Sequence, residues 1–128
     1  MEEYKFRGKS IDDLKKMSIQ ELMVIANADF RRAFKRGLSP EEKAFLKNMD
    51  KKSAKSKNIR THMREMFILP SLVGLTIHVY NGKEFIPIEI KPSMVFHRLG
   101  EFALSTKQVK HGSPGMKATR SSGFVPIK

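Results

Sequence analysis

The feature that most constrains this chain is an alternation of apolar and polar residues on both sides of an Asn-Gly pair. Aliphatic side chains occupy every second position from Val73 to Val79, and isoleucines occupy every second position from Ile86 to Ile90. Asn-Gly between two such runs is the strongest short hairpin signal, because both residues tolerate positive φ. The pattern predicts an antiparallel hairpin with Asn81-Gly82 as a two-residue turn and one buried aliphatic face.

That turn fixes a register with one conflict. It pairs Ile77 with Ile86, so that all the aliphatic side chains fall on the same face of the hairpin. It also places Pro87 opposite Thr76 at a hydrogen-bonded position, where proline has no N–H to donate. We therefore expect a bulge at this point, or an edge strand whose pairing loosens.

Short helices are predicted before the hairpin. Three serines, Ser10, Ser18 and Ser39, are each followed three residues later by an acid. In this pattern the hydroxyl caps the first turn of a helix and the carboxylate returns to the cap residue. Pro40 suits a first helical position, and Gly37 suits the stop of a helix over Phe30–Arg36.

The remaining segments complete an α+β fold, with a small antiparallel sheet made of the hairpin plus a third strand. Met66–Leu69, ended by Pro70, is the predicted third strand, and Ser93–Leu99 is a predicted short helix ended by Gly100. Residues 51–58 carry no apolar anchor and are predicted to be a loop. We divide the chain into an N-terminal helical extension (1–30), an α/β core (31–105) and an extended basic tail (106–128).

Charge is the main indication of function. The chain has 25 Lys and Arg against 13 Asp and Glu, a net charge of +12. The excess is concentrated, with +9 in residues 31–64 and +5 in residues 106–128, while residues 1–30 and 65–105 each carry −1. Such segregation favours a polyanionic partner over an evenly solvated surface.

Catalytic and metal-binding patterns are absent from the sequence. The four histidines lie 14 to 19 residues apart and there is no cysteine, so no cluster has the spacing of metal ligands. No nucleophile elbow, phosphate loop or dinucleotide fingerprint occurs. We therefore expect no enzyme activity, no cofactor, no metal and no small-molecule substrate. No apolar run reaches the length of a membrane span, and no secretory signal is visible, so we expect no membrane partner either.

The cations themselves are the candidate site residues. Few aromatics accompany them, and nothing resembles the aromatic platform of an RRM or a GXXG loop, so the expected mode is contact with phosphates and shape. Arg60, Arg64, Lys110 and Lys117 in particular are expected to act mainly through phosphates. The full set of predicted RNA-binding cations is Arg31, Arg32, Lys35, Arg36, Lys52, Lys55, Lys57, Arg60, Arg64, Lys107, Lys110, Lys117 and Arg120.

Several motifs in order resemble one known family. They are Arg60-Thr61-His62-Met63-Arg64-Glu65-Met66, Ile68-Leu69-Pro70, Val73-Gly74, Val79-Tyr80-Asn81-Gly82-Lys83, Glu89-Ile90-Lys91-Pro92, Leu99-Gly100-Glu101-Phe102, Val109-Lys110-His111-Gly112 and Ala118-Thr119-Arg120-Ser121-Ser122. From roughly Arg31 to Ser122 the chain is similar to the universal small-subunit ribosomal protein S-nineteen. The N-terminal helices and the Lys-His-Gly-Ser-Pro-Gly tail resemble its archaeal and eukaryotic branch, whose eukaryotic member is called S-fifteen.

The resemblance implies a structural protein in the head of the small ribosomal subunit, in the cytoplasm. It implies binding to small-subunit ribosomal RNA next to ribosomal protein S-thirteen, with the tail directed toward the decoding region. It adds His62, Lys83, His97 and His111 to the candidate RNA-binding residues. The chain departs from the family pattern at Ser93, where Glu is usual, and at Phe96, where Gly is usual.

Two other classes of function fit parts of the pattern. A chromatin-like or regulatory protein that binds nucleic acid alone would show the same charge, and the ordered motifs are what favour the ribosomal interpretation. A small nucleic-acid enzyme would need a catalytic constellation, and the sequence shows none.

Overall fold

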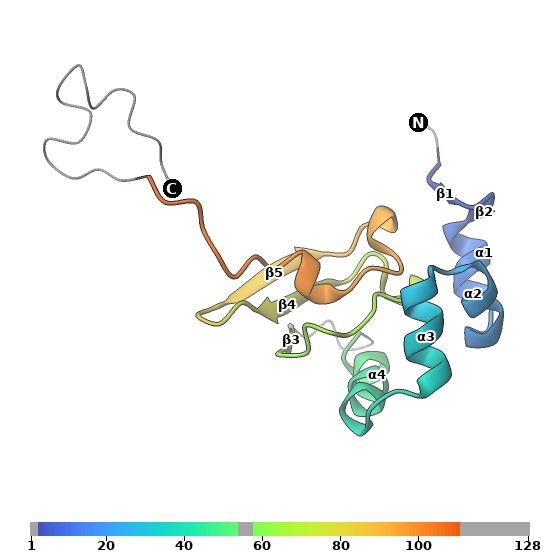
Figure 1. The fold of residues 1–128 in the computed structure, drawn as a ribbon, viewed down its shortest axis with the longest axis horizontal. Helices are drawn as coiled ribbons and strands as arrows, with labels where there is room; N and C mark the ends of the chain where they lie inside the picture. The colour runs from blue at the N-terminus through green and yellow to red at the C-terminus, as the bar shows by residue number, and fades with distance from the viewer. Residues whose placement is uncertain (1–2, 54–57, 111–128) are drawn as a thin grey trace, which may run out of the picture.

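The computed structural model describes residues 3–53 and 58–110 and shows an α+β fold, as predicted. Figure 1 shows helices gathered at one end of a small sheet, whose hairpin points away from them. The helices are α1 (Ile11–Lys16), α2 (Ile19–Ile25), α3 (Ala28–Arg36) and α4 (Pro40–Ser53), and the strands are β1 (Lys5–Phe6), β2 (Lys9–Ser10), β3 (Ile59–Thr61), β4 (Thr76–Tyr80) and β5 (Phe85–Glu89). Three 3₁₀ turns, Pro70–Leu72, Pro92–Met94 and Leu99–Glu101, join them.

The helix starts predicted at Ser10, Ser18 and Ser39 are confirmed, whereas α3 begins at Ala28, two residues before the predicted range. Ser10 and Ser18 cap α1 and α2, and in each case the serine Oγ accepts from the backbone N–H three residues on. At the start of α4 the Ser39 N–H donates to the Glu42 carboxylate over 2.7 Å, and the Glu42 N–H donates back to Ser39 Oγ. Gly37 ends α3 at a φ of 93°, which glycine adopts without strain.

Residues 51–58 were predicted to form a loop, and for the first part of that range the prediction is wrong. Helix α4 continues through Ser53, with Lys51 and Lys52 in its last turn. The negative end of the helix dipole stabilises cations at this position. Residues 54–57 lie outside the described part of the chain.

The hairpin forms, with a register shifted by two residues. Val79 pairs with Ile86 and Ile77 with Ile88, so the loop has four residues, Asn81–Glu84, rather than two. The Asn81 side-chain oxygen accepts from the backbone N–H groups of Lys83 and Glu84, both at 2.9 Å, so it closes the loop as a side-chain acceptor. A shift of two keeps every side chain on its predicted face, and Ile77, Val79, Ile88 and Ile90 are buried.

The corrected register also removes the conflict at Pro87. Hydrogen bonds join Asn81 to Glu84 (3.1 Å) and Ile90 to Leu75 (3.0 Å). Since hydrogen-bonded pairs alternate along an antiparallel ladder, the Pro87–His78 pair between them is a non-hydrogen-bonded one. The backbone nitrogen of Pro87 therefore points to the unpaired edge of β5, where no N–H is needed. The strand continues past Pro87 without a bulge.

The predicted third strand is wrong. The strand that joins the hairpin is β3, which pairs parallel to β4, so the three-stranded sheet is mixed, in the order β3-β4-β5. Met66–Leu69 is a buried extended segment that pairs elsewhere. The Ile68 N–H donates to His97 O (2.8 Å), and the Leu99 N–H donates to Met66 O (2.9 Å).

The same pairing explains why the predicted helix over Ser93–Leu99 is absent. The backbone groups of residues 96–99 are used by residues 66–68 and are not free to form helical hydrogen bonds. Two 3₁₀ turns flank this segment instead, and Gly100 lies inside the second one.

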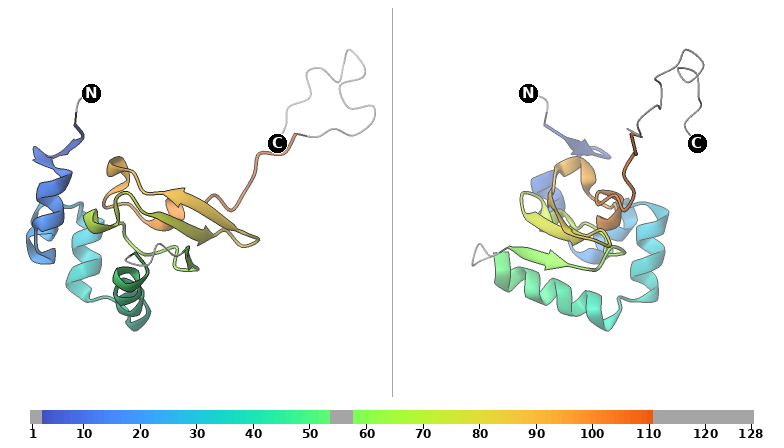
Figure 2. Two further views of the ribbon diagram at one scale, coloured as in Figure 1. Left: turned by 180° about the vertical axis from the view of Figure 1, so that it is seen from behind. Right: turned by 90° about the vertical axis from the view of Figure 1, so that its left-hand side faces the viewer.

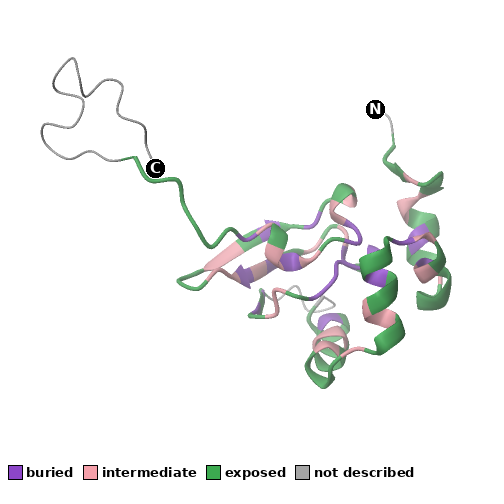
Figure 3. Ribbon diagram, in the orientation of Figure 1, coloured by how far each residue is buried: buried purple, intermediate pink, exposed green. Residues whose placement is uncertain are grey.

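One core joins these parts. Leu14, Leu22 and Phe30 from the N-terminal helices are buried with residues of the sheet and of the segment 66–72. In Figure 3 the buried positions face inward between the helices and the sheet, and the outer faces of the helices are exposed. Figure 2 shows α4 running along β3, and residues 104–110 leave the sheet as an exposed extended segment.

Candidate nucleic-acid interface

Helix α3 carries the most concentrated group of predicted site residues. Arg31, Arg32, Lys35 and Arg36 are all exposed on it, whereas Phe30 is fully buried and Phe34 half-buried. None of these four cations forms an ion pair within the described residues. The helix therefore presents a set of uncompensated charges to solvent. We call Arg31, Arg32, Lys35 and Arg36 the α3 cation face.

Aromatic packing holds this helix on the core. The Phe30 ring stacks on Phe34 with centroids 4.2 Å apart, and its edge meets Phe67 at 5.4 Å and Phe96 at 5.0 Å. Edge-to-face pairs of this kind add about 0.5–1.5 kcal/mol each beyond the area they bury. The cations on the opposite side are thus mounted on a fixed support.

Arg98 fixes the same helix by charge. Its guanidinium donates to the Asp29 carboxylate at 3.1 Å and to the Glu65 carboxylate, and it lies 4.7 Å from the centroid of the Phe67 ring. Burial alone would lower the pKa of Arg98, but hydrogen bonds and charge attraction from Asp29 and Glu65 raise it, so the group stays charged. Sequence reasoning missed this residue because its partners lie 69 and 33 positions away.

Arg64 has an internal role in the structure. The half-buried guanidinium donates to three backbone carbonyls, those of Tyr80 (2.8 Å), Gly100 (3.0 Å) and Ala103 (2.6 Å). The Gly100 N–H donates back to Arg64 O at 2.8 Å, and a Cβ at Gly100 would lie 2.9 Å from the Arg64 Cβ. These donors tie β4 to the segment after Leu99, so Arg64 has a structural role beside the phosphate contact that the sequence predicts for it.

Arg60, His62 and Lys83 lie at the hairpin end of the sheet. All three are exposed. The Arg60 guanidinium lies 5.5 Å from the Phe85 ring centroid, and the His62 ring lies 4.5 Å from Tyr80 and 5.2 Å from Phe85. This aromatic grouping was not predicted, because Phe85 and Tyr80 become neighbours only in the corrected register.

The other predicted residues are dispersed. Lys52 is exposed at the end of α4, Lys107 lies 3.7 Å from the Glu84 carboxylate, Lys110 is exposed, and the His97 ring contacts Glu101 at 2.9 Å. The structure therefore brings the candidates into two groups, at α3 and at the hairpin end, rather than one. The predicted residues that fall outside the described part of the chain are Lys55, Lys57, His111, Lys117 and Arg120.

Phe96 occupies a backbone conformation that suits glycine. Its φ is 67°, a left-handed value that costs other residues about 1–2 kcal/mol. The ring is buried and packs at 5.0 Å against both Phe6 and Phe30, so it links β1 and α3 to the core. The departure at this position thus places an aromatic ring in the core and not toward a ligand. The other departure, Ser93, is an exposed residue of a 3₁₀ turn.

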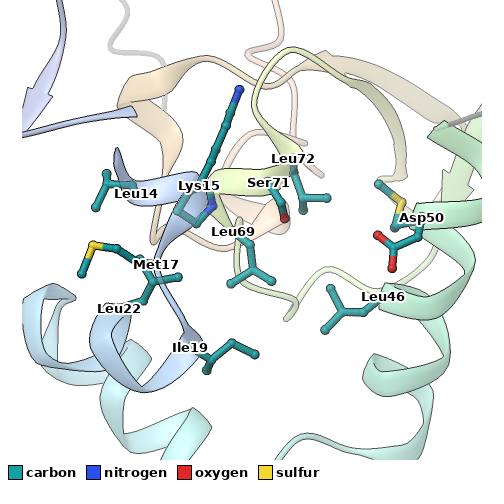
Figure 4. Close-up of a pocket in the computed structure, with 12 residues that line it drawn as sticks. Leu14, Lys15, Met17, Ile19, Leu22, Leu46, Asp50, Leu69, Ser71 and Leu72 are labelled. Atoms are coloured by element: carbon teal, nitrogen blue, oxygen red, sulfur yellow. The ribbon is translucent and has the colours of Figure 1, made fainter. Parts of the chain in front are cut away.

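One hollow of the described chain has a mainly apolar lining. It has a volume of about 240 Å³ and lies between the N-terminal helices, α4 and residues 69–72. In Figure 4 its walls are mainly aliphatic, with Lys15, Asp50 and Ser71 at its margin. Among the described residues no group of three His, Asp or Glu side chains could hold a metal ion, and no helix in these ranges is long and apolar enough to cross a membrane.

Comparison with known proteins decides the family. The model of the family described as ribosomal protein S19 matches residues 32–111. The chain belongs to this family. It is 49% identical over 127 residues to the small ribosomal subunit protein uS19 of Methanoculleus marisnigri, covering 99% of this chain and 90% of that protein. It is 48% identical over 127 residues to its namesake in Methanoregula boonei, covering 99% and 89%.

Membership of the family settles the class of function. The chain is a structural ribosomal protein of the small subunit and not an enzyme, and it is located in the cytoplasmic ribosome. The match also extends over the N-terminal helices, beyond the family model, and the two relatives support the archaeal and eukaryotic type.

Proposed function

We propose that the α3 cation face binds phosphates of small-subunit ribosomal RNA in the head of the subunit. The observation that carries this proposal is that four exposed cations lie on one short helix without ion-pair partners in the described chain. Cations of this kind release condensed counterions when they meet a phosphate backbone. Because Phe30 and Arg98 fix α3 on the core, less conformational entropy is lost when its cations contact phosphates.

Filter binding to small-subunit ribosomal RNA from Methanoculleus marisnigri over a potassium chloride series tests the proposal. The variant is Arg31→Gln with Lys35→Gln, one turn apart on α3. The control is Lys15→Gln with Lys16→Gln, which removes two exposed cations at the end of α1. Each lost phosphate contact should reduce the logarithmic salt slope by about 0.7–0.9, so the α3 variant should lose about 1.4–1.8 and the control almost nothing. Equal slopes for both variants would contradict the proposal.

The position within the head is part of the same proposal. The family resemblance supports a site next to ribosomal protein S-thirteen, with the tail of residues 106–128 directed toward the decoding region. The exposed course of residues 104–110 away from the sheet is compatible with this path. A photo-crosslinker at Val109, which is 59% exposed, should label decoding-region RNA in assembled subunits. Labelling confined to RNA distant from that region would refute the path.

A further inference from the structure

We infer that the hairpin end of the sheet is a stacking platform for an unpaired RNA base, formed by His62, Tyr80 and Phe85 with Arg60 at its side. This inference rests on the proposed function, because it assumes that the chain binds ribosomal RNA. It differs from the sequence-based expectation, which gave recognition to phosphates and shape alone.

The topology explains why these side chains gather. Tyr80 and Phe85 are the last cross-strand pair before the loop. They lie on the face opposite the buried Val79 and its half-buried partner Ile86. Side chains of such a pair stand close together, and these two ring centroids are 5.1 Å apart. His62 follows directly after β3, which runs parallel to β4, so its ring reaches the same face.

The three rings form a cluster that is fixed but not sealed. His62 is exposed, and Tyr80 and Phe85 are only half-buried. Interplanar angles of 51°, 76° and 53° leave the rings tilted on one another rather than stacked face to face. Ring surface is therefore left open toward solvent.

Hydrogen bonds hold the cluster in place. The Tyr80 hydroxyl donates to Gly82 O over 2.9 Å, and Tyr80 O accepts from the Arg64 guanidinium over 2.8 Å. The internal role of Arg64 is thus to brace the strand end that carries Tyr80. A platform fixed before binding loses little conformational entropy when a ligand stacks on it.

The charges around the platform select a nucleic acid as its ligand. Arg60 lies against the Phe85 ring. Lys83 and Lys107 line a hollow of about 450 Å³ at the hairpin loop, whose residues 81–84 separate Tyr80 from Phe85 in the chain. Glu84, the acid in this hollow, already lies 3.7 Å from Lys107. Proteins that bind single-stranded nucleic acid combine aromatic rings, on which bases stack, with cations that contact the phosphates. We expect an unpaired base because the faces of paired bases are covered by their neighbours in the helix.

The test uses the full chain and the same ribosomal RNA from Methanoculleus marisnigri. Phe85→Leu keeps an apolar side chain but removes the ring, Phe85→Tyr keeps the ring, and Tyr4→Leu removes an exposed aromatic far from the cluster. Loss of one stacked base should weaken binding by about 5- to 150-fold, taking tenfold per 1.4 kcal/mol. The salt slope should stay unchanged, because no phosphate contact is lost, and Phe85→Tyr and Tyr4→Leu should bind as the unaltered chain does.

A second measurement follows the platform directly. The sequence contains two tyrosines and no tryptophan, so Tyr4→Phe leaves Tyr80 as the one source of tyrosine emission. Its fluorescence lifetime should shorten when RNA binds, because a stacked base quenches the ring. An unchanged lifetime on a chain that binds RNA would overturn the inference.

The outcomes separate this inference from the proposed function. If the unaltered chain fails to bind RNA, the proposed function falls and the platform falls with it. If the chain binds and Phe85→Leu binds equally well, the platform alone is refuted. A Phe85→Leu variant that binds RNA normally but is lost from assembled subunits would point to a protein at this surface, and would also refute a stacked base.

Discussion

Replacing Phe96 tests the strain and the packing at one position. With φ at 67°, any residue with a Cβ bears a cost of about 1–2 kcal/mol, whereas glycine does not. The ring, 2% exposed and 5.0 Å from both Phe6 and Phe30, contributes about 3–5 kcal/mol that truncation removes. Phe96→Ala loses the ring and keeps the strain. Phe96→Gly loses the ring and relieves the strain.

We therefore expect the glycine variant to be more stable than the alanine variant, the reverse of their order in a helix. In a helix glycine is less stable than alanine by about 0.5–1 kcal/mol, but at Phe96 we expect the glycine variant to be more stable by about 1 kcal/mol. Urea denaturation followed by circular dichroism measures both differences. The matched control is Phe34→Ala against Phe34→Gly in α3, where alanine should be the more stable. A glycine variant at Phe96 that unfolds at lower urea than the alanine variant would refute the reasoning.

Four further predictions concern stability. Arg64→Lys should lower the free energy of unfolding by about 1–3 kcal/mol, because an ammonium cannot reach all three carbonyls; a chemical denaturation midpoint equal to that of the unaltered chain would argue against the brace. Gly100→Ala should cost about 1–3 kcal/mol in the same assay, since its Cβ would lie 3.0 Å from Arg64 O; a neutral effect would mean that the close approach relaxes freely. Ile88→Ala should cost about 2–5 kcal/mol, because the side chain is 5% exposed against the core, and a loss well under 1 kcal/mol would show that it is not core. The backbone N–H of Ser18, and after it the Ser18 hydroxyl, hold the pKa of Glu21 below its ordinary value of 4.5, so their stabilisation is complete above that value and is lost as pH falls through the lowered pKa. Ser18→Ala removes the hydroxyl and keeps the backbone N–H, so the pKa of Glu21 measured by NMR should rise part of the way toward 4.5; an unchanged pKa would assign the whole shift to the backbone.

Local signals in the sequence predicted local structure well. The serine caps, the stop at Gly37 and the inward aliphatic face of the hairpin follow from interactions within a few residues, and all are present. The register was predicted from Asn81-Gly82 as a turn with positive φ at both residues. In the structure Asn81 uses its side-chain oxygen as an acceptor instead, which favours a four-residue loop. Both turns keep the same face buried, so the pattern could not distinguish them.

Long-range relations could not be predicted in this way. Met66–Leu69 has the composition of a strand, and which segment it pairs with depends on residues 96–99, about 30 positions away. Arg64 and Arg98 were both part of the general excess of cations, and only their surroundings show that one binds carbonyls and the other carboxylates. The composition predicted a polyanionic partner. Which cations are bound within the fold and which are exposed to solvent could be seen only in the structure.

This chain is a structural component of the small ribosomal subunit, where it binds ribosomal RNA. The most direct test is to express the tagged full chain in Methanoculleus marisnigri and to separate the extract on sucrose gradients after a high-salt wash. We expect the tagged chain to sediment with the small subunit and to remain there through the wash. A chain that stays at the top of the gradient, or that sediments with chromosomal DNA, would contradict a structural role in the subunit.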